Sequence, residues 1–302
     1  MARCRICRQK ASIFIPHHRL PLCDEHFVSW FENYLRRTIQ KFRMFSREAR
    51  ILVAVSGGKD SLVLWKALVK LGYAADGVFI DLGIEDFSFL SRRVVEDFAA
   101  TLGRKLYVVS LQKELGFGIP ALKRRTKKYC SLCGSIKRYF LNWATRKFHY
   151  EVLLTGHNLD DEASALLGNV INWSIKYLGR KYPVLPAHSG FPQKAKPLCR
   201  FTSFEIQEYA KRQKIKYIKE SCPLSSEAKR LVFAEMMDQL EEQMPGTKLR
   251  FYLDYLRRAF PIFQEKVEDF LDHKLVTCAR CGEPAISSPC FICRLKEEYQ
   301  GA

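Results

Sequence analysis

Residues 51–61 read ILVAVSGGKDS, and this stretch decides the fold. The apolar run from Ile51 to Val55 is typical of a strand buried in a parallel sheet. Two glycines follow at once, and an apolar pattern of helical spacing then begins at Leu62. A strand, a glycine-rich turn and a helix in this order bring backbone N–H groups to a position where they can hold a phosphate.

The turn offers further groups that bind phosphate. Lys59 brings a positive charge, and Asp60 can help to organise Mg²⁺. The spacing differs from that of a Walker A loop, which has four residues between its first glycine and Gly-Lys. We therefore expect a nucleotide site formed by Ser56, Gly57, Gly58, Lys59, Asp60 and Ser61.

Strands and helices continue to alternate along the chain. Further strands are predicted at 77–81, 106–109 and 152–155, with helices at about 88–102 and after Cys133. This alternation is typical of an α/β fold with a doubly wound parallel sheet, whose ligands bind at the carboxyl ends of the strands. The last of these strands leads into GHNLDDEA at 156–163, so we expect this segment and the turn to face one crevice.

Two functions stay open for Asp160 and Asp161 in this second segment. Their carboxylates can bind Mg²⁺ or orient the attacked group, or they can cap the helix that follows.

Composition and charge limit the class of protein. The chain has 302 residues, 47% of them hydrophobic, which is typical of a globular protein. No stretch approaches the roughly 20 apolar residues of a membrane span, and the first residues lack a signal-peptide core, so a cytoplasmic protein is expected. The 50 Lys and Arg against 32 Asp and Glu give a net charge of +18. Such a charge favours a polyanionic partner, nucleic acid before anionic membrane, although a merely basic enzyme would also fit.

Eight of the 11 cysteines form four C-x-x-C pairs, which in a cytosolic chain indicates metal or redox chemistry. Two pairs near the C-terminus have the spacing of a closed tetrahedral zinc site, with the ligands Cys278, Cys281, Cys290 and Cys293. The N-terminus has a looser version, with the ligands Cys4, Cys7, Cys23 and His26. His17 and His18 compete with His26 but break the spacing. Segments this short cannot bury a core, so the metal would supply most of their folding free energy.

The pair Cys130 and Cys133 has no matching second pair, and only Cys199 and Cys222 remain. The residues leave three interpretations open: buried thiols or a half-used knuckle, a redox dithiol, or an iron–sulfur cluster held by three cysteines.

The motifs together resemble one known group of enzymes. The turn matches the S-G-G-x-D-S loop of the PP-loop ATP-pyrophosphatases, and the second segment matches their G-H-N-x-D-D-x-A motif. With zinc knuckles at both ends, a central C-x-x-C and Cys222-Pro223, the chain resembles the TtcA/TtuA group of tRNA 2-thiouridine synthetases, and the TtuA type most. The resemblance extends from Cys4 to Cys293.

The resemblance implies an ATP-dependent reaction in which a tRNA uridine is adenylated at its C2 carbonyl and then receives sulfur. It implies that Cys130, Cys133 and Cys222 hold a [4Fe–4S] cluster, with Cys199 as the substitute if Cys222 is not a ligand. It favours Asp161 as the functional carboxylate and Lys137 as an aid to catalysis, the alternative for Lys137 being a solvated surface lysine. Ile80 would bracket adenine, and the small residues Ala54 and Gly156 would let the ligand approach closely.

The resemblance also implies a ubiquitin-like carrier as sulfur donor, and position 54 as the target rather than the wobble position. Two alternatives are kept. One replaces the cluster with a persulfide-and-disulfide cycle of Cys130 and Cys133, and the other is a zinc-stapled RNA-binding protein with a vestigial nucleotide loop. The basic run at 123–128 leads directly into Cys130, where it could contact the phosphate backbone of tRNA.

These patterns predict five segments. They are a zinc finger at 1–27, a linking helix at 28–47, the catalytic domain at 48–222, a helical region at 223–270 and a second zinc finger at 271–302. The helical region has apolar side chains at helical spacing and no visible chemistry, so we expect it to pack or to form a homodimer.

Overall fold

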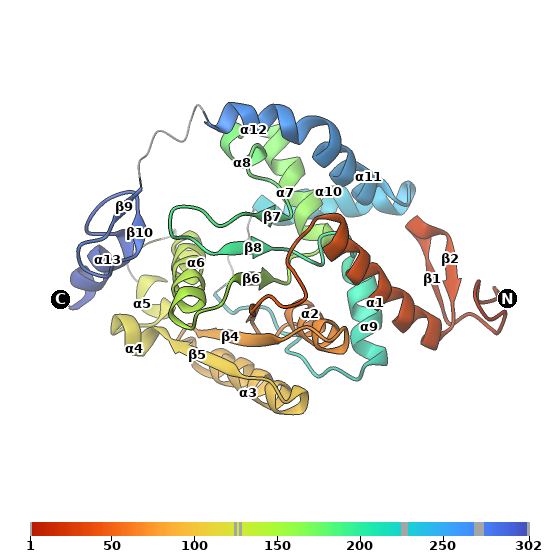
Figure 1. Ribbon diagram of the computed structural model, residues 1–302, viewed down its shortest axis with the longest axis horizontal. Coiled ribbons are helices and arrows are strands. Elements are labelled where there is room, and N and C mark those ends of the chain that lie inside the picture. The colour runs from red at the N-terminus through yellow and green to blue at the C-terminus, as the bar shows by residue number, and fades with distance from the viewer. Residues whose placement is uncertain (1, 124–125, 127–128, 225–228, 269–274, 301–302) are drawn as a thin grey trace.

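The computed structural model describes residues 2–123, 126, 129–224, 229–268 and 275–300. A six-stranded sheet in the order β5-β4-β3-β6-β8-β7 forms its centre (Figure 1). The strands are β3 (Ile51–Val55), β4 (Ala75–Asp81), β5 (Leu106–Ser110), β6 (Val152–Thr155), β7 (Val184–Leu185) and β8 (Gln193–Ala195). All neighbours run parallel except β7 and β8, which are antiparallel. The predicted α/β fold with a doubly wound, mostly parallel sheet is confirmed.

Side chains of β3 alternate between two hydrophobic cores, one on each face of the sheet. Ile51, Val53 and Val55 belong to the larger core, and Leu52 belongs to the smaller one. The larger core also contains side chains of α1 (Asp24–Lys41), α2 (Lys59–Lys70), α3 (Glu85–Leu102), α7 (Leu159–Ile171) and α9 (Ser203–Arg212). The smaller core contains side chains of α4 (Leu111–Leu115), α5 (Ile119–Lys123) and α6 (Tyr129–Lys147).

The helix after the glycine-rich turn packs closely on the sheet. The indole of Trp65 on α2 donates a hydrogen bond of 2.9 Å to the carbonyl of Ala75 on β4. A Cβ added at Gly77 would lie 2.6 Å from the Trp65 ring. Gly77 therefore lets the indole lie directly on the strand.

A helical layer follows the catalytic domain in the chain. It consists of α10 (Lys229–Gln243), α11 (Thr247–Asp254), a π-helical turn at Tyr255–Ala259 and α12 (Phe260–Glu268), which lie beside α7 and α8 (Ile175–Leu178) in Figure 1. The Phe233 ring of α10 fits against Gly168 of α7, where a Cβ would lie 3.0 Å from it. The described part of the region predicted as helical is thus helical, and it covers α7.

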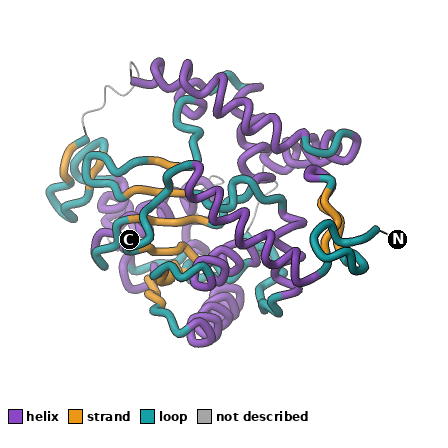
Figure 2. Tube along the Cα trace, turned by 45° about the vertical axis from the view of Figure 1, so that its right-hand side comes forward, coloured by secondary structure: helices purple, strands orange, loops and turns teal. Residues whose placement is uncertain are grey.

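Each end of the chain forms a small module, and Figures 1 and 2 show the two modules on different sides of the molecule. The N-terminal module is the hairpin β1 (Ile13–Ile15) and β2 (Leu20–Leu22), joined by a 3₁₀ turn at Pro16–His18 and followed by α1. The C-terminal module contains β9 (Val276–Thr277), β10 (Pro284–Ala285) and α13 (Phe291–Gln300). The helix predicted within 28–47 is α1, which begins earlier, at Asp24, and ends at Lys41.

Candidate nucleotide and metal sites

The glycine-rich turn is built around the hydroxyl of Ser61 in the first turn of α2. The Ser56 backbone N–H donates to this hydroxyl over 3.2 Å, and the hydroxyl lies 3.1 Å from the Gly58 carbonyl. Gly57 has a φ of +83°, a conformation that favours glycine, and Ser91 lies only 3.3 Å from where its Cβ would be. The turn therefore leads β3 directly into the N-terminus of α2, where the helix dipole favours an anion.

The Lys59 side chain contacts a second helix, α9. Its ammonium group donates 2.7 Å hydrogen bonds to the carboxylate of Asp60 and to the hydroxyl of Ser203 at the start of α9. The structure thus places Lys59, Asp60 and the N-terminus of α9 together.

The second motif begins α7 with a capping box. The Asn158 side chain accepts from the Asp161 backbone N–H over 3.1 Å, and the Asp161 carboxylate accepts from the Asn158 backbone N–H over 3.2 Å. Asp160 instead accepts from the Ser203 backbone N–H and from the Lys248 ammonium group, both over 2.6 Å. Both carboxylates therefore have structural partners, and a role for Asp161 in catalysis would come in addition to its capping bond.

The two motifs contact each other through Gly156. A Cβ at this position would lie 2.9 Å from the Ser61 backbone nitrogen, so Gly156 lets the end of β6 touch the start of α2. Gly156 was expected to make room for a ligand. The structure shows that a side chain here would already collide with the backbone of Ser61. Ala54 and Ile80 lie near the carboxyl ends of β3 and β4, and both contribute to the smaller core on the α6 side.

A buried ion-pair network next to these motifs was not predicted from the sequence. Glu162 is 1% exposed and pairs with Lys196 at 2.9 Å and with Lys181 at 3.0 Å. Burial opposes its ionisation, but the two lysines outweigh burial and lower the pKa of Glu162 to about 2. No local sequence pattern predicts this network, because Glu162 lies on α7, Lys181 follows α8 and Lys196 follows β8. Lys181 is buried and serves as an internal partner of Glu162.

Cys130 and Cys133 lie in the first turns of α6, so the helix begins before the pair rather than after it. The Cys130 sulfur lies 3.4 Å from the carbonyl of Leu224, which places it beside the segment that carries Cys222. Burial raises the pKa of the Cys133 thiol, the charge of Lys137 opposes this, and Cys222 and Cys130 are both close enough to add to it. These three cysteines and Lys137 therefore share one region. Cys199 is fully buried in the larger core, and burial raises the pKa of its thiol to about 12.

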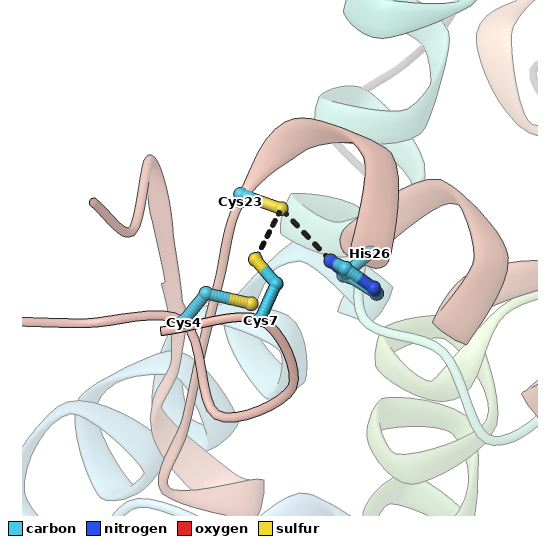
Figure 3. A group of neighbouring side chains, drawn as sticks. All are labelled: Cys4, Cys7, Cys23 and His26. Carbon is cyan, nitrogen blue, oxygen red and sulfur yellow. Dashed lines mark hydrogen bonds between the residues drawn. The ribbon is translucent and has the colours of Figure 1, made fainter. Parts of the chain in front are cut away.

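The structure brings the N-terminal ligand set together (Figure 3). The sulfurs of Cys7 and Cys23 are 3.8 Å apart, and Nδ1 of His26 is 3.1 Å from the Cys23 sulfur. With Cys4, all four ligand atoms lie within 4.8 Å of one another. Two sulfurs bound about 2.3 Å from one tetrahedral zinc ion would be about 3.8 Å apart, so this group can hold such an ion.

The C-terminal set, Cys278, Cys281, Cys290 and Cys293, meets the same condition. Burial opposes ionisation of Cys278, but backbone N–H groups, among them that of Cys290 at 3.2 Å, outweigh burial and lower the pKa of the Cys278 thiol to about 6. This favours the thiolate, which is the form that binds metal.

A third group among the described residues contains His17, His18 and Glu205. The two histidines therefore do not join the N-terminal cysteines, for which they were considered as rivals of His26. Burial and the neighbouring His17 lower the pKa of His18 to about 4.

The surface that would receive RNA is described in part. Within the basic run at 123–128, residues 124, 125, 127 and 128 lie outside the described residues. Beyond the run, Lys137 and Arg138 are exposed on α6, whereas Arg146 pairs with Glu283 at 2.9 Å. In the part of the chain that the structure describes, no helix is long and apolar enough to cross a membrane.

A strand, an S-G-G-x-D-S turn, a helix and an adjoining G-H-N motif on a parallel sheet define a PP-loop domain. The sequence profile of the PP-loop domain matches residues 31–232, and the profile described as "2-thiouridine synthetase TtuA, N-terminal LIM domain" matches residues 3–28.

The sequence is similar to those of known enzymes over nearly its whole length. The tRNA-5-methyluridine(54) 2-sulfurtransferase of Thermus thermophilus is 41% identical over 293 residues, covering 97% of this chain and 90% of the relative. The enzyme of the same name from Thermotoga maritima is 38% identical, covering 99% and 97%. The U34-tRNA thiolase NcsA from Methanococcus maripaludis, solved with its [4Fe-4S] cluster, superposes with a TM-score of 0.79 at 24% identity, covering 99% and 96%, and so shares the fold. The chain belongs to the TtuA-type 2-thiouridine synthetases of the PP-loop family, which confirms the resemblance seen in its motifs.

Proposed function

We propose that this chain is an ATP-dependent tRNA 2-sulfurtransferase that replaces the C2 oxygen of uridine 54 in the T-loop with sulfur. The observation that carries the proposal is the full-length similarity to two enzymes named for that position, at 41% and 38% identity. The wobble uridine is the second candidate, because the superposable archaeal thiolase is named for U34.

The first step activates a poor leaving group. The C2 oxygen of uridine attacks the α-phosphate of ATP, and pyrophosphate leaves. The turn around Gly57 and the N-terminus of α2 would receive the departing phosphates, and Lys59 would exchange one of its present hydrogen bonds for a phosphate oxygen. Asp60 and Asp161 are the carboxylates that we propose for Mg²⁺.

The second step replaces the adenylate. A sulfur nucleophile attacks C2, and AMP leaves with the former C2 oxygen. We propose that Cys130, Cys133 and Cys222 hold a [4Fe–4S] cluster, because they bring three soft thiolates to one partly exposed region. Their three sulfurs do not all lie within 4.8 Å of one another, as the ligand atoms of the two terminal sets do. A wider spacing is compatible with a cluster, because a cluster is larger than a single ion. When bound, such a cluster supplies an iron with an open position for sulfur.

The proposal also covers the metals, the RNA surface and the partners. Zinc would fill the two terminal sets, because their sulfur separations suit it. Exposed basic residues such as Lys137 and Arg138 beside the cysteines suit an RNA phosphate backbone. We also propose a ubiquitin-like sulfur carrier, from family resemblance, a homodimer, from the apolar pattern of the helical region, and a cytoplasmic location, from the sequence pattern.

An anaerobic reconstitution tests the function and the cluster together. The full chain is incubated with ATP, Mg²⁺, sulfide and unmodified tRNA, and thiolated tRNA is separated on a mercury-containing gel. Cys222→Ala should lose bound iron and nearly all thiolation, whereas the matched variant Cys199→Ala should keep both. Full activity in colourless, iron-free protein would favour the Cys130–Cys133 persulfide cycle instead. Unchanged function in Lys59→Ala and Asp161→Ala would favour an RNA-binding protein with a vestigial loop.

A further inference from the structure

A cluster of three metal-ligating side chains lies where the N-terminal hairpin meets α9, apart from both cysteine sites. His17 and His18 come from the 3₁₀ turn between β1 and β2, and Glu205 comes from the first turn of α9. One ligand atom of each lies within 4.8 Å of the other two. Nε2 of His17 is 3.4 Å from Oε1 of Glu205, and the two imidazole rings are 4.2 Å apart.

The side chains of His17 and Glu205 are buried and that of His18 is partly buried, and the three atoms that meet make no hydrogen bond among the described residues. The His17 side chain is 4% exposed and the Glu205 side chain 0%. Nε2 of His17, Nε2 of His18 and Oε1 of Glu205 all lack a partner among the described residues. Buried polar atoms normally have hydrogen-bond partners, so three without one at a single point require an explanation.

The other oxygen of Glu205 is already used. Oε2 accepts from the Thr202 backbone N–H over 2.7 Å and from the Thr202 hydroxyl over 2.9 Å, which fixes the carboxylate. Oε1 is therefore held toward the histidines by the capping box of α9. A ligand held rigidly by hydrogen bonds to its second atom is typical of metal sites.

The Arg200 guanidinium is close enough to act on His18, and its Nε has no hydrogen-bond partner among the described residues. The Arg200 guanidinium stacks on the Tyr34 ring at 4.4 Å and donates to the Thr38 hydroxyl over 3.4 Å. These contacts hold the guanidinium against α1, and no hydrogen bond from it to His17, His18 or Glu205 is found among the described residues.

We propose that His17, His18 and Glu205 bind a divalent transition-metal ion, with Zn²⁺ as the ion of choice. Two imidazoles and one carboxylate suit zinc and iron(II) and leave at least one position for water. Water can reach the site, because His17 also lines a cavity of about 510 Å³ between α1 and α11.

The site joins the N-terminal module to the nucleotide crevice. Ser203, two residues before Glu205, holds Lys59 through its hydroxyl and Asp160 through its backbone N–H. An ion on Glu205 would therefore tie the hairpin to the same helix start that positions Lys59.

Location of the metal tests the proposal on the intact chain. Crystals of the full chain are briefly soaked in zinc chloride, and anomalous difference maps are recorded on both sides of the zinc absorption edge. We expect a peak between His17, His18 and Glu205 besides the peaks at the two cysteine sets, which serve as internal controls. Peaks at the cysteine sets alone would overturn the proposal.

Measuring the zinc content of the protein in solution tests whether zinc binds only at the high concentration used for the crystals. The chain is dialysed against low-micromolar free zinc and its zinc content is measured by mass spectrometry. We expect three zinc ions for the wild type and for the exposed control His188→Gln, and two for Glu205→Gln, whose amide oxygen can keep the capping bond to Thr202. Two ions in the wild type, or three in Glu205→Gln, would contradict the site. If Glu205→Gln fails to fold, the wild-type count and map still decide.

Discussion

The two terminal modules have similar ligand sets but pack on opposite faces of the sheet. Cys4 lies in the larger core with side chains of α1 and α9, and Cys7 and Cys23 pack against it. Cys278 and Cys290 instead belong to the smaller core, with Ile136 and Phe140 of α6. The N-terminal module is therefore part of the main core, whereas the C-terminal module packs on α6 and on the segment between α4 and α5, on the other face.

The helix α6 carries two of the three proposed cluster ligands, Cys130 and Cys133. Arg146 of α6 pairs with Glu283, and Phe117 stacks on Tyr299 at a centroid distance of 4.2 Å. The comparison suggests that metal in the N-terminal module stabilises the whole fold, and that metal in the C-terminal module fixes α6, and with it Cys130 and Cys133.

The largest expected effect breaks the N-terminal module. Structural zinc supplies roughly 10–16 kcal/mol in small fingers, which is comparable to the whole stability of a domain. Cys23→Ala should therefore lose one zinc ion and the cooperative thermal transition, measured by circular dichroism.

Cys281→Ala is the matched variant in the other module. It should lose one zinc ion, keep the main thermal transition and thiolate poorly because α6 is no longer held. Equal loss of the transition in both variants would contradict the difference between the modules.

The next effect concerns chemistry rather than folding. Lys59→Ala removes a charge that we assign to the phosphates, so thiolation should fall about 100-fold or more. The melting temperature should stay close to that of Lys70→Ala, a surface lysine of the same helix that pairs with Glu32. A small loss of rate in Lys59→Ala would place the phosphates elsewhere.

Acid should weaken the larger core through Glu162. Its pKa in the folded chain is lowered to about 2, below an ordinary value near 4.5, so its ion pairs stabilise the fold fully above about pH 5. This stability is lost as the pH falls toward 2, and it amounts to on the order of 3 kcal/mol. Urea unfolding between pH 6 and pH 3 measures it. Glu162→Gln should be less stable at pH 6 and flatter with pH; an unchanged slope in this variant would remove Glu162 as the cause.

The smallest expected effect concerns packing on the same face. Gly77→Ala would place its Cβ 2.6 Å from the Trp65 ring, and such overpacking costs about 1–3 kcal/mol. Gly103→Ala is a useful contrast, because nothing lies within 4 Å of its Cβ and only its φ of +60° opposes the change. Urea unfolding should show the greater loss of stability for Gly77→Ala; the reverse order would mean that the indole shifts freely.

The sequence pattern predicted the central strand and the glycine-rich turn, whose signals lie within a few consecutive residues. The apolar run at 51–55 and the glycines after it identified the central strand and the turn. By contrast, β7 has two residues and β8 includes Gln193 and Lys194, so neither has a strand pattern. The helix predicted after Cys133 is α6, which already begins at Tyr129.

The sites show the same division. Ligand sets with short regular spacing, such as Cys278 to Cys293, are visible in the sequence. Glu162 with its two lysines, and His17 and His18 with Glu205, come together only through the fold. For Asp161 the sequence left a functional role and helix capping open, and the structure shows the capping bond to Asn158.

Mapping the sulfur in tRNA tests the central claim most directly. Transfer RNA lacking 2-thiouridine is treated anaerobically with the chain, ATP, Mg²⁺ and sulfide, and is then digested and sequenced by mass spectrometry. We predict that one oxygen is replaced by sulfur in the T-loop fragment that contains uridine 54, and that the anticodon fragment keeps its mass. Sulfur at the wobble uridine, or in neither fragment, would contradict the account.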